Sequence, residues 1–522
     1  IESKLTQMRT ESASTRAFLV VAAVFLLIIG AEVLAILRLN DGKFVYTLDD
    51  PYIHLALAEN IWKGHYGVNL NEVSAPSSSI LWPYLLAPLA TVEYWPLVLN
   101  AVFGVLTIWI LLRVLALTVR RESSGVFFFA GVGAALVVAT NLVGLSLTGM
   151  EHVLQVLAVV LAGYGLALDA RLDQLRPWLV PVAMFMPAIR YENLAVTAAV
   201  IAYLFLTGRR SLAAWTLLGA VVVITTFSVY LASMGLGYFP SSVAVKSDLV
   251  GESKKVVALL KNLYHSFNSR PGLLLAMIAF FIAMHRPKDG GPKTSALSWS
   301  LLVTLTLHLL LGRYGWYNRY EIYVLAFAIV LLMVMFLPEW QGLRNFSQVK
   351  HTLVLGAPLL IAGLPYIVGL ATAPLASNNI FEQHYQMHRF VTSYLREPVA
   401  VNDLGYVAYK NDEYVLDLYG LGSEQARHLF RSQSNGDWMA ALCRDHEVRV
   451  AMIYTSWFKS LPSSWVKLGE LSLSRYNHTP AHPVVEIYAT SEEHVGETLS
   501  RLSSFKESLP PRIVLSITPD VP

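Results

Sequence analysis

Eleven apolar stretches, separated by short polar segments, fill most of the first 370 residues. A helix that crosses a bilayer needs about 20 predominantly apolar residues, and we take each stretch as long enough to span. The pattern predicts a polytopic α-helical membrane protein with about eleven transmembrane helices, plus a short apolar element at 80–91. The stretches are 17–38, 95–119, 125–145, 151–168, 177–189, 194–207, 211–232, 271–285, 297–311, 320–337 and 352–370.

The pattern changes near residue 371, where shorter segments with helical periodicity follow β-rich runs. About 150 residues are enough for one domain, and mixed helices and strands are typical of α/β folds. We therefore predict a transmembrane domain over residues 1–370 and a soluble carboxyl-terminal α/β domain over residues 371–522. The predicted elements of the second domain are helices at 381–396 and 437–446 and strands at 414–418, 448–454 and 484–489.

Composition supports a membrane protein and narrows the function. Hydrophobic residues make up 55% of the chain and charged residues 14%, against roughly a quarter charged in soluble proteins. The net charge of +3 argues against a nucleic-acid partner. Cys443 is the single cysteine, so we expect a buried thiol and no internal disulfide. The sequence contains no P-loop, dinucleotide fingerprint or HExxH zinc motif.

Lysine and arginine fall in alternate loops if eleven helices span the membrane, and such residues mark the cytoplasmic side. The first stretch is longer than a signal-peptide core and lacks a small-residue cleavage site, so we expect it to be retained. We predict a cytoplasmic amino terminus, with the loop after the first stretch and everything beyond residue 370 outside. The basic residues are Lys4, Arg9, Arg16, Arg120, Arg121, Arg171, Arg176, Arg209, Arg210, Arg286, Lys288, Lys293, Arg344 and Lys350.

Two adjacent carboxylates, Asp49 and Asp50, stand about a dozen residues beyond the first apolar stretch. Acidic residues at the mouth of a membrane helix are costly to keep without a use. Asp50 precedes Pro51, which is the pattern of an N-cap followed by proline in the first helical turn. Asp50 is therefore either a capping carboxylate or a catalytic one. Asp49 has no capping duty in this pattern, so we choose Asp49 as the candidate base.

A helix should follow this acidic pair. We expect it to end near Lys63, where Gly64 closes it, and to carry Ile53, Leu57 and Ile61 on one apolar stripe. Such spacing is typical of an amphipathic helix lying along a membrane surface. His54 lies one turn beyond Asp50. It is either a packed or interfacial histidine or a residue that binds substrate.

Several short segments resemble those of GT-C glycosyltransferases, which are membrane enzymes that take sugars from polyprenyl-phosphate carriers. Residues 46–54, 64–67 and 77–83 resemble the first extracytoplasmic loop of these enzymes, with its Asp-Asp pair and Gly-His-Tyr-Gly turn. Residues 237–246 and 312–320 resemble segments of the arabinofuranosyltransferase-like branch. The resemblance implies a polyprenyl-phosphate pentofuranose donor, and it places the protein in a bacterial inner membrane with a periplasmic site.

The sequence departs from the arabinofuranosyltransferase-like branch in one segment and resembles related enzymes in a further one. Pro240-Ser241-Ser242 stands where the branch usually has Pro-Asn-Thr, which leaves the sugar open. Residues 401–405 and 416–422 resemble the start of the soluble domain in related bacterial enzymes. The acceptor implied is a hydroxyl group of a glycan, a lipid or a protein such as a pilin, and membrane lipid is a further partner.

Transfer from a polyprenyl phosphate to a hydroxyl group needs a base that takes the acceptor proton. The leaving phosphate is already an anion, so no second carboxylic acid is required, in contrast to glycosidases. The base would be Asp49, and direct displacement would invert the anomeric centre. Lys246 and Arg319, with Tyr317 nearby, are candidates to hold the donor phosphate. The alternative for both basic residues is snorkelling to lipid headgroups.

Three further residues lie in predicted outer turns. Arg190 and Glu192 are read as a salt bridge that holds a turn, with donor binding as the other possibility. Glu151 either orients an acceptor hydroxyl or caps the following helix. We expect no required cofactor and no metal. The alternative is a divalent cation bound by an Asp-Asp-Glu cluster. The competing functional class is a transporter or flippase of lipid-linked saccharides, which usually has internal repeats and polar groups at the membrane midplane.

Overall fold

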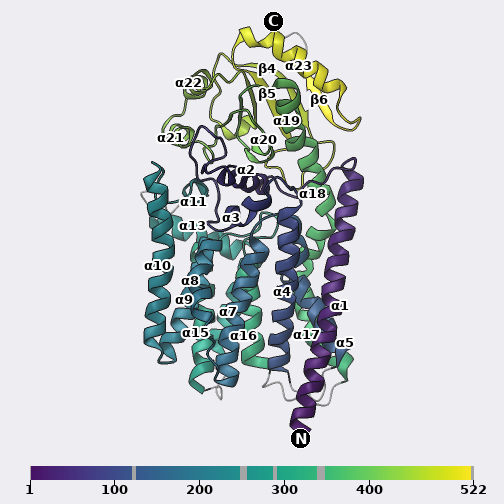
Figure 1. Cartoon of the computed structure of the whole chain (residues 1–522), viewed down its shortest axis with the longest axis vertical. Helices are drawn as coiled ribbons and strands as arrows, with labels where there is room; N and C mark the ends of the chain where they lie inside the picture. Colours follow the sequence, from purple (N-terminus) through teal and green to yellow (C-terminus); the bar gives the residue numbers. More distant parts are fainter. Residues whose placement is uncertain (1, 120–124, 247–254, 286–290, 338–346, 519–522) are drawn as a thin grey trace. The chain divides into compact units, whose positions relative to one another are not determined.

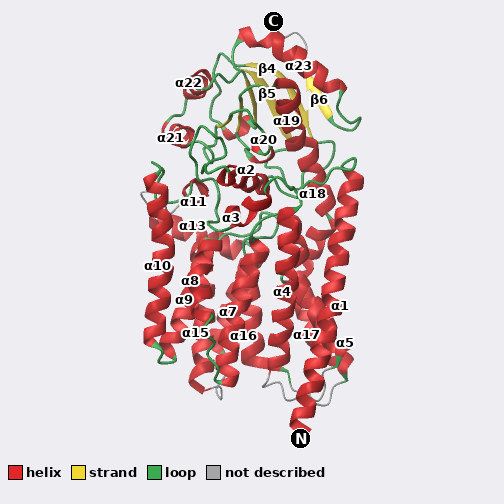
Figure 2. Ribbon diagram, viewed as in Figure 1, coloured by secondary structure: helices red, strands yellow, loops and turns green. Residues whose placement is uncertain are grey.

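The computed structural model describes residues 2–119, 125–246, 255–285, 291–337 and 347–518 (Figure 1). Helices form most of this part of the chain, and the strands lie in the carboxyl-terminal segment (Figure 2). Internal contacts divide the chain into two compact units. The helical unit contains Ile1–Glu32, Leu97–Phe227 and Glu252–Ala371, and the mixed unit contains Val33–Pro96, Ser228–Gly251 and Thr372–Pro522.

Long apolar helices build the helical unit, and they run in similar directions in Figure 1. Helices α1 and α10 begin in this unit and continue into the mixed unit. Its elements are α1 (Glu2–Leu39), α4 (Trp95–Thr118), α5 (Val126–Ala139), α6 (Leu142–Leu147), α7 (His152–Leu172), α8 (Leu179–Ile189), η2 (Tyr191–Asn193), α9 (Leu194–Leu206), α10 (Arg210–Ser233), α13 (Lys255–Asn268), α14 (Arg270–Met284), α15 (Gly291–Leu311), α16 (Ile322–Phe336) and α17 (Gln348–Ala371).

Six helices in the described ranges are long and apolar enough to cross a membrane: α1, α4, α7, α10, α15 and α17. The pair α13 and α14, bent by 93° at its break, brings the number to seven if the pair is one span. Helices α5, α8, α9 and α16 are apolar but shorter. Each of the eleven predicted stretches falls on a helix, while the number of true spans stays a prediction.

Large apolar side chains on several of these helices point away from the protein. Leu27 of α1, Trp215 of α10 and Ile361 of α17 are more than half exposed. Exposed apolar surface on this scale is unfavourable in water and is covered by hydrocarbon in a membrane. Between helices the packing is close: a Cβ at Gly163 of α7 would lie 2.7 Å from a methyl group of Val330 in α16. Small residues allow this approach in membrane bundles.

The mixed unit combines short helices with a six-stranded sheet. The strand order is β2-β1-β3-β5-β4-β6, with β2, β1 and β3 parallel and the other neighbours antiparallel. The strands are β1 (Val399–Val401), β2 (Val415–Asp417), β3 (Val450–Ile453), β4 (Val466–Ser472), β5 (Val484–Ala489) and β6 (Val514–Ile517). The helices are α2 (Asp50–Trp62), α3 (Trp82–Leu86), η1 (Ala87–Leu89), α11 (Ser241–Lys246), α18 (Ala373–Ile380), η5 (Phe381–Tyr385), α19 (Gln386–Arg389), η6 (Phe390–Leu395), α20 (Gly405–Ala408), α21 (Glu424–Ser432), α22 (Asp437–Asp445), η7 (Thr455–Trp457), η8 (Glu492–His494) and α23 (Val495–Glu507).

The carboxyl-terminal sheet follows the predicted pattern in part. Strands β2, β3 and β5 and helix α22 lie where the sequence predicted them, and residues 381–395 form a continuous run of π- and α-helix. Strands β1, β4 and β6 were not predicted. All residues of β1, β2 and β3 are buried, as expected for parallel strands covered on both faces.

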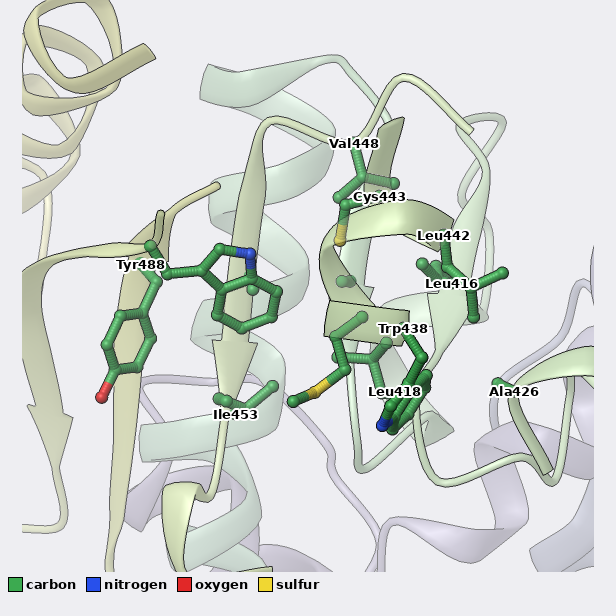
Figure 3. Packing of buried hydrophobic residues seen from close by; sticks show 13 residues of the cluster. Leu416, Leu418, Ala426, Trp438, Leu442, Cys443, Val448, Ile453 and Tyr488 are labelled. Atoms are coloured by element: carbon green, nitrogen blue, oxygen red, sulfur yellow. The ribbon is translucent and has the colours of Figure 1, made fainter. Parts of the chain in front are cut away.

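Helix α22 covers one face of this sheet and closes its core. Trp438, Leu442 and Cys443 of α22 form one buried cluster with Leu416 of β2 and Ile453 of β3 (Figure 3). Cys443 is buried and unpaired, as the sequence predicted. Burial of these side chains orders the strands whose carboxyl ends carry the polar residues discussed below.

Within the mixed unit, the polar loop after α1 packs against the carboxyl-terminal segment. The rings of Tyr52 in α2 and Tyr406 in α20 have centroids 3.8 Å apart. Glu93 accepts hydrogen bonds from both hydroxyl groups, at 3.1 Å from Tyr52 and 2.6 Å from Tyr406. The two compact units therefore do not coincide with the predicted domains 1–370 and 371–522, because residues 33–96 and 228–251 belong to the same unit as the carboxyl-terminal segment. Whether residues 371–522 fold independently stays a prediction.

Helix α2 differs from the predicted amphipathic surface helix. It ends at Trp62, and Gly64 adopts a φ of +83°, close to the expected end. The residues from Pro51 to Ala58 are all buried, on every side of the helix, whereas Ile61 of the predicted apolar stripe is partly exposed. The amphipathic prediction was wrong because protein also surrounds side chains outside the expected apolar stripe, such as Tyr52, whose ring lies against Tyr406 of α20.

Candidate functional site

Asp49 and Asp50 begin helix α2, but not in the predicted arrangement. The helix starts at Asp50, and Asp49 occupies the N-cap position without a capping hydrogen bond from its side chain. The prediction that Asp50 is the N-cap was therefore wrong by one residue. Asp49 has helical backbone angles, φ −82° and ψ −32°, whereas capping residues are usually extended, which explains why its carboxylate does not cap.

The Asp49 carboxylate instead reaches the carboxyl-terminal segment of the same unit. Its Oδ1 accepts a 2.8 Å hydrogen bond from the backbone N–H of Tyr406, at the start of α20. A Cβ at Gly405 would overlap this carboxylate, so a larger residue there would push the Asp49 side chain out of its position. Asp49 is 7% exposed, and its Oδ2 is buried without a hydrogen-bond partner among the described residues. One oxygen is thus anchored and the other is not.

His384 and Asp403 complete a group that we call the Asp49 cluster: Asp49, His384 and Asp403. The Nε2 atom of His384 lies 3.0 Å from Asp403 Oδ2 and 3.9 Å from Asp49 Oδ2. His384 comes from the π-helical segment η5, and Asp403 follows strand β1. The Tyr454 hydroxyl lies 3.3 Å from the same Nε2 and donates to Gln383. The cluster therefore brings two carboxylates to one imidazole nitrogen.

Burial and neighbouring charges shift the pKa values of Asp49 and His384. Burial raises the pKa of Asp49, and the nearby carboxylates Asp403 and Asp50 raise it further, against His384 and the Tyr406 amide. Burial alone would lower the pKa of His384, but the charges of Asp49 and Asp403 outweigh it and raise that pKa. Asp49 and His384 consequently hold a proton more firmly than the isolated side chains would, which suits a carboxylate that accepts a proton near neutral pH.

The other predicted residues of the mixed unit have simpler surroundings. Asp50 is partly exposed, and its charge acts on both Asp49 and His384. His54 is buried, and its Nδ1 lies 3.1 Å from the Ser77 hydroxyl, so it is a packed histidine in this structure. Lys246 is the last residue of α11, and its side chain lies outside the described part of the chain.

A second charged group lies in the helical unit, between α8 and α9 and at the start of α7. Arg190 forms ion pairs with Glu151 at 2.5 Å and with Glu192 at 2.7 Å. The Arg190–Glu192 salt bridge predicted from the sequence is therefore present. Glu151 occupies the N-cap position of α7, yet its side chain makes no capping hydrogen bond and binds Arg190 instead.

Arg319 belongs to the same group through the ring of Tyr320. The Arg190 and Arg319 guanidinium groups lie 5.7 Å and 5.0 Å from the centre of that ring, and Arg319 Nη2 donates to the Tyr320 hydroxyl. Arg319 is 2% exposed, so its guanidinium does not extend to the protein surface as a snorkelling residue would. We call these residues the Tyr320 cluster: Glu151, Arg190, Glu192, Arg319 and Tyr320.

Tyr317 lies beside this cluster in the chain but has a separate contact. Its hydroxyl donates to the carbonyl oxygen of Gly369 at 3.1 Å. Trp316, Tyr317 and Asn318 have φ angles of 43°, 62° and 55°. Three consecutive non-glycine residues in the left-handed region are strained, and such strain persists only where the surroundings enforce it.

The structure thus gathers the predicted residues into two groups in different units, and it adds residues that sequence reasoning missed. His384, Asp403, Gly405 and Tyr406 were not predicted as site residues. Asp403 carried a signal, because polar residues that directly follow a buried parallel strand often lie in functional sites. Gly405 and Tyr406 follow it in the next helix. His384 sits inside a helical segment and carried no comparable signal.

A segment of the mixed unit matches a known protein family. Residues 378–488 match a family described as a domain of unknown function (DUF8728). No curated protein matches the chain. The family match falls in the mixed unit and includes His384, Asp403 and the strands from β1 to β4 and most of β5.

Several solved structures show a weak similarity. An oligosaccharyltransferase from Archaeoglobus fulgidus, in complex with Zn and sulfate, is 13% identical with a TM-score of 0.45, and the match covers 94% of this chain and 75% of that one. The arabinofuranosyltransferase AftD from Mycobacteria is 13% identical with a TM-score of 0.40, covering 90% of this chain and 41% of that one. At TM-scores below 0.5, these similarities assign neither a family nor an activity to this chain.

Proposed function

We propose that the protein is a GT-C-type membrane glycosyltransferase that transfers a sugar from a polyprenyl-phosphate donor to a hydroxyl group of a glycan, lipid or protein acceptor. The observation that carries the proposal is the Asp49 carboxylate, which is anchored through Oδ1 and whose buried Oδ2 has no hydrogen-bond partner in the described part of the chain. This carboxylate lies in the loop whose sequence resembles the first outer loop of GT-C enzymes. The apolar helices of the chain provide the membrane setting that a lipid-linked donor requires.

The proposed reaction assigns Asp49 the role of proton acceptor. The acceptor oxygen forms a bond to the anomeric carbon, while the bond from that carbon to the phosphate oxygen breaks and its electrons leave on the phosphate. The acceptor proton passes to Asp49, whose raised pKa brings its proton affinity closer to what a base needs near neutral pH. Attack opposite the leaving phosphate inverts the anomeric centre.

Cationic side chains would stabilise the phosphate that departs. Arg319 is the proposed clamp in the helical unit, because its guanidinium is already held in position by Tyr320. Lys246 is the second proposed clamp, on the basis of the segment 237–246. Glu151, Arg190 and Glu192 are proposed to hold the surrounding structure or the acceptor. Arabinofuranose or another pentofuranose is the proposed sugar, from the resemblance of the short segments alone.

The proposed orientation places the amino terminus in the cytoplasm and the Asp49 loop on the outer side of a bacterial inner membrane. A polyprenyl-phosphate donor suits this side, because nucleotide sugars are confined to the cytoplasm. Reporter fusions after residues 210 and 376 should give cytoplasmic and external signals, respectively. A cytoplasmic signal after residue 376 would contradict the orientation and the donor argument together.

The direct test uses purified full-length protein in nanodiscs with synthetic polyprenyl-phosphate arabinose and a simple hydroxyl acceptor. We expect a glycosylated product from the wild-type chain and none when nucleotide-linked arabinose replaces the lipid donor. Arg319→Ala and Lys246→Ala should raise the KM for the lipid donor more than the KM for the acceptor. Turnover with the nucleotide sugar alone, or lipid movement without a new glycosidic bond, would contradict the proposal.

A further inference from the structure

We propose that Asp49, His384 and Asp403 form a binding site for one divalent transition-metal ion. A carboxylate oxygen of each aspartate and a ring nitrogen of His384 all lie within 4.8 Å of one another. Carboxylate oxygens and imidazole nitrogens bind such an ion at about 2.0–2.2 Å, so neighbouring ligand atoms of one ion are roughly 3–3.5 Å apart. His384 Nε2 is 3.0 Å from Asp403 Oδ2, at the short end of this range, and 3.9 Å from Asp49 Oδ2, slightly beyond it.

The Oδ2 atom of Asp49 is a second, independent observation that points to a ligand. Asp49 is more than nine-tenths buried, and Oδ2 has no hydrogen-bond donor among the described residues. A buried acceptor without a partner carries a free-energy cost of about 1–3 kcal/mol, and more when the group is charged. Oδ2 faces His384 Nε2, the atom that Asp403 also approaches. A cation between the three side chains would give Oδ2 the partner that the protein does not supply.

The charge of the cluster also favours a cation. Asp49 and Asp403 place two carboxylates on one imidazole, and the charge of Asp50 acts on the same two residues, Asp49 and His384. A buried group with more carboxylates than cationic partners is unfavourable unless its charge is compensated. In the metal-free chain a proton on Nε2 can bridge His384 to Asp403. A metal ion would take the place of that proton, which is the usual exchange when histidine becomes a ligand.

The surroundings hold the ligands in place and leave access to them. Tyr406 fixes the Asp49 carboxylate through its backbone N–H, and Gly405 allows that close approach. His384 lies in the π-helical segment η5, and π-helical segments occur frequently at functional sites. The Asp403 side chain is 27% exposed, so the cluster is open to solvent on one side.

The donor set indicates the kind of ion. Carboxylates suit hard ions such as Mn²⁺, while imidazole suits Zn²⁺ and its neighbours, so one imidazole with two carboxylates fits Mn²⁺ or Zn²⁺. Three protein ligands leave at least one coordination position for another molecule, which is the arrangement of reactive rather than purely structural sites.

The role of the ion rests on the proposed function, whereas the existence of the site does not. A divalent ion would polarise the donor phosphate or the acceptor hydroxyl and make the hydroxyl more acidic. An ion on Oδ2 would lower the pKa of Asp49, so in the metal-bound form the ion's effect on the acidity of the hydroxyl group would replace the raised pKa of Asp49 as the driving force for proton transfer. The carboxylate would still offer a lone pair to receive the proton, because it has about four lone-pair positions. The Tyr406 amide takes one of these positions and the ion another.

The test measures metal binding directly in full-length protein purified in detergent and stripped with a chelator. Mn²⁺ is added, and the free ion is followed by electron paramagnetic resonance. We expect one tightly bound Mn²⁺ per wild-type chain, displaced by Zn²⁺. His384→Gln and Asp403→Asn should weaken binding by more than the roughly 10- to 100-fold loss typical of residues that only support a metal ligand.

His388→Gln is the matched control, because His388 lies four residues farther along the same helical run and does not belong to the cluster. We expect unchanged Mn²⁺ binding in this variant. Thermal unfolding checks folding: Mn²⁺ should raise the Tm of the wild type and of His388→Gln, but not of His384→Gln. Absence of binding to the wild type, or equal binding to folded His384→Gln and Asp403→Asn, would overturn the site.

Failure of this inference and failure of the proposed function give different results. Mn²⁺ binding without sugar transfer would keep the site and reject the transferase. Sugar transfer by chelator-treated protein that binds no Mn²⁺ would keep the transferase and reject the site.

Discussion

The Asp49 cluster in the mixed unit and the Tyr320 cluster in the helical unit are both buried and charged, but their charges are balanced differently. In the Tyr320 cluster, Arg190 bridges two glutamates at short distance, and Tyr320 lies against both arginines. In the Asp49 cluster, two carboxylates share one imidazole, and Asp49 Oδ2 has no hydrogen-bond donor among the described residues. Paired charges hold structure in place, whereas an incompletely paired carboxylate is available to take a proton or an ion.

Asp49→Asn should give the largest effect, with turnover reduced about 10²- to 10⁴-fold, as expected for loss of a positioned base. Asparagine keeps the shape and the acceptor for the Tyr406 N–H, so folding should be nearly unchanged. Asp50→Asn is the control and should be milder, because Asp50 is partly exposed and lies outside the three-residue cluster. Turnover is measured with lipid-linked donor and compared with Tm. Near-normal turnover in Asp49→Asn would move the base elsewhere.

Substitutions in the Tyr320 cluster should lower the stability of the protein and not only its turnover. Arg190→Met removes the cation that pairs with Glu151 and Glu192, so the buried Glu151 loses this ion pair. Breaking a buried pair in this way typically costs about 3–5 kcal/mol. Glu192→Gln should cost less, because the Glu192 side chain is 33% exposed. The measurement is thermal unfolding in detergent, and equal Tm values for both variants and the wild type would contradict the structural role.

These two clusters also show where sequence reasoning succeeds. Asp49 was visible because an acid pair beside a long apolar stretch is a local pattern, and Arg190 and Glu192 are two residues apart. Hydropathy is equally local, so every predicted apolar stretch falls on a helix. Cys443 and helix α22 followed from the same kind of periodicity.

The missed features depend on contacts between distant parts of the chain. Asp49 and its donor Tyr406 are 357 residues apart, and no local pattern joins them. Strand β1 has three residues and was too short to recognise until β2 and β3 paired with it. The burial of α2 was missed for the same reason, since Tyr52 of α2 lies against Tyr406 of α20, 354 residues farther along the chain.

Gly405→Ala should disturb the Asp49 cluster without removing any of its functional groups. The added methyl group would overlap the Asp49 carboxylate and displace it from the Tyr406 amide. Overpacking of this kind costs about 1–3 kcal/mol, and we expect lower kcat with a modest fall in Tm. Gly496→Ala in α23 is the control, because a Cβ there meets no described atom within 4 Å. Full activity in Gly405→Ala would show that the position of Asp49 is not critical.

Substitution of Cys443 should have the smallest effect of these changes. It tests the core of the mixed unit rather than the Asp49 cluster. Burial raises the pKa of this thiol to about 12, so at pH 8 it is protonated and unreactive in the folded protein. We expect negligible labelling by a maleimide at pH 8 in mild detergent and complete labelling after denaturation. Cys443→Ser should remain folded with a slightly lower Tm, because a hydroxyl group replaces a buried thiol packed against the strands. Rapid labelling of the native protein would show that α22 opens from the sheet, and would weaken the view that this core fixes the strand ends near Asp403.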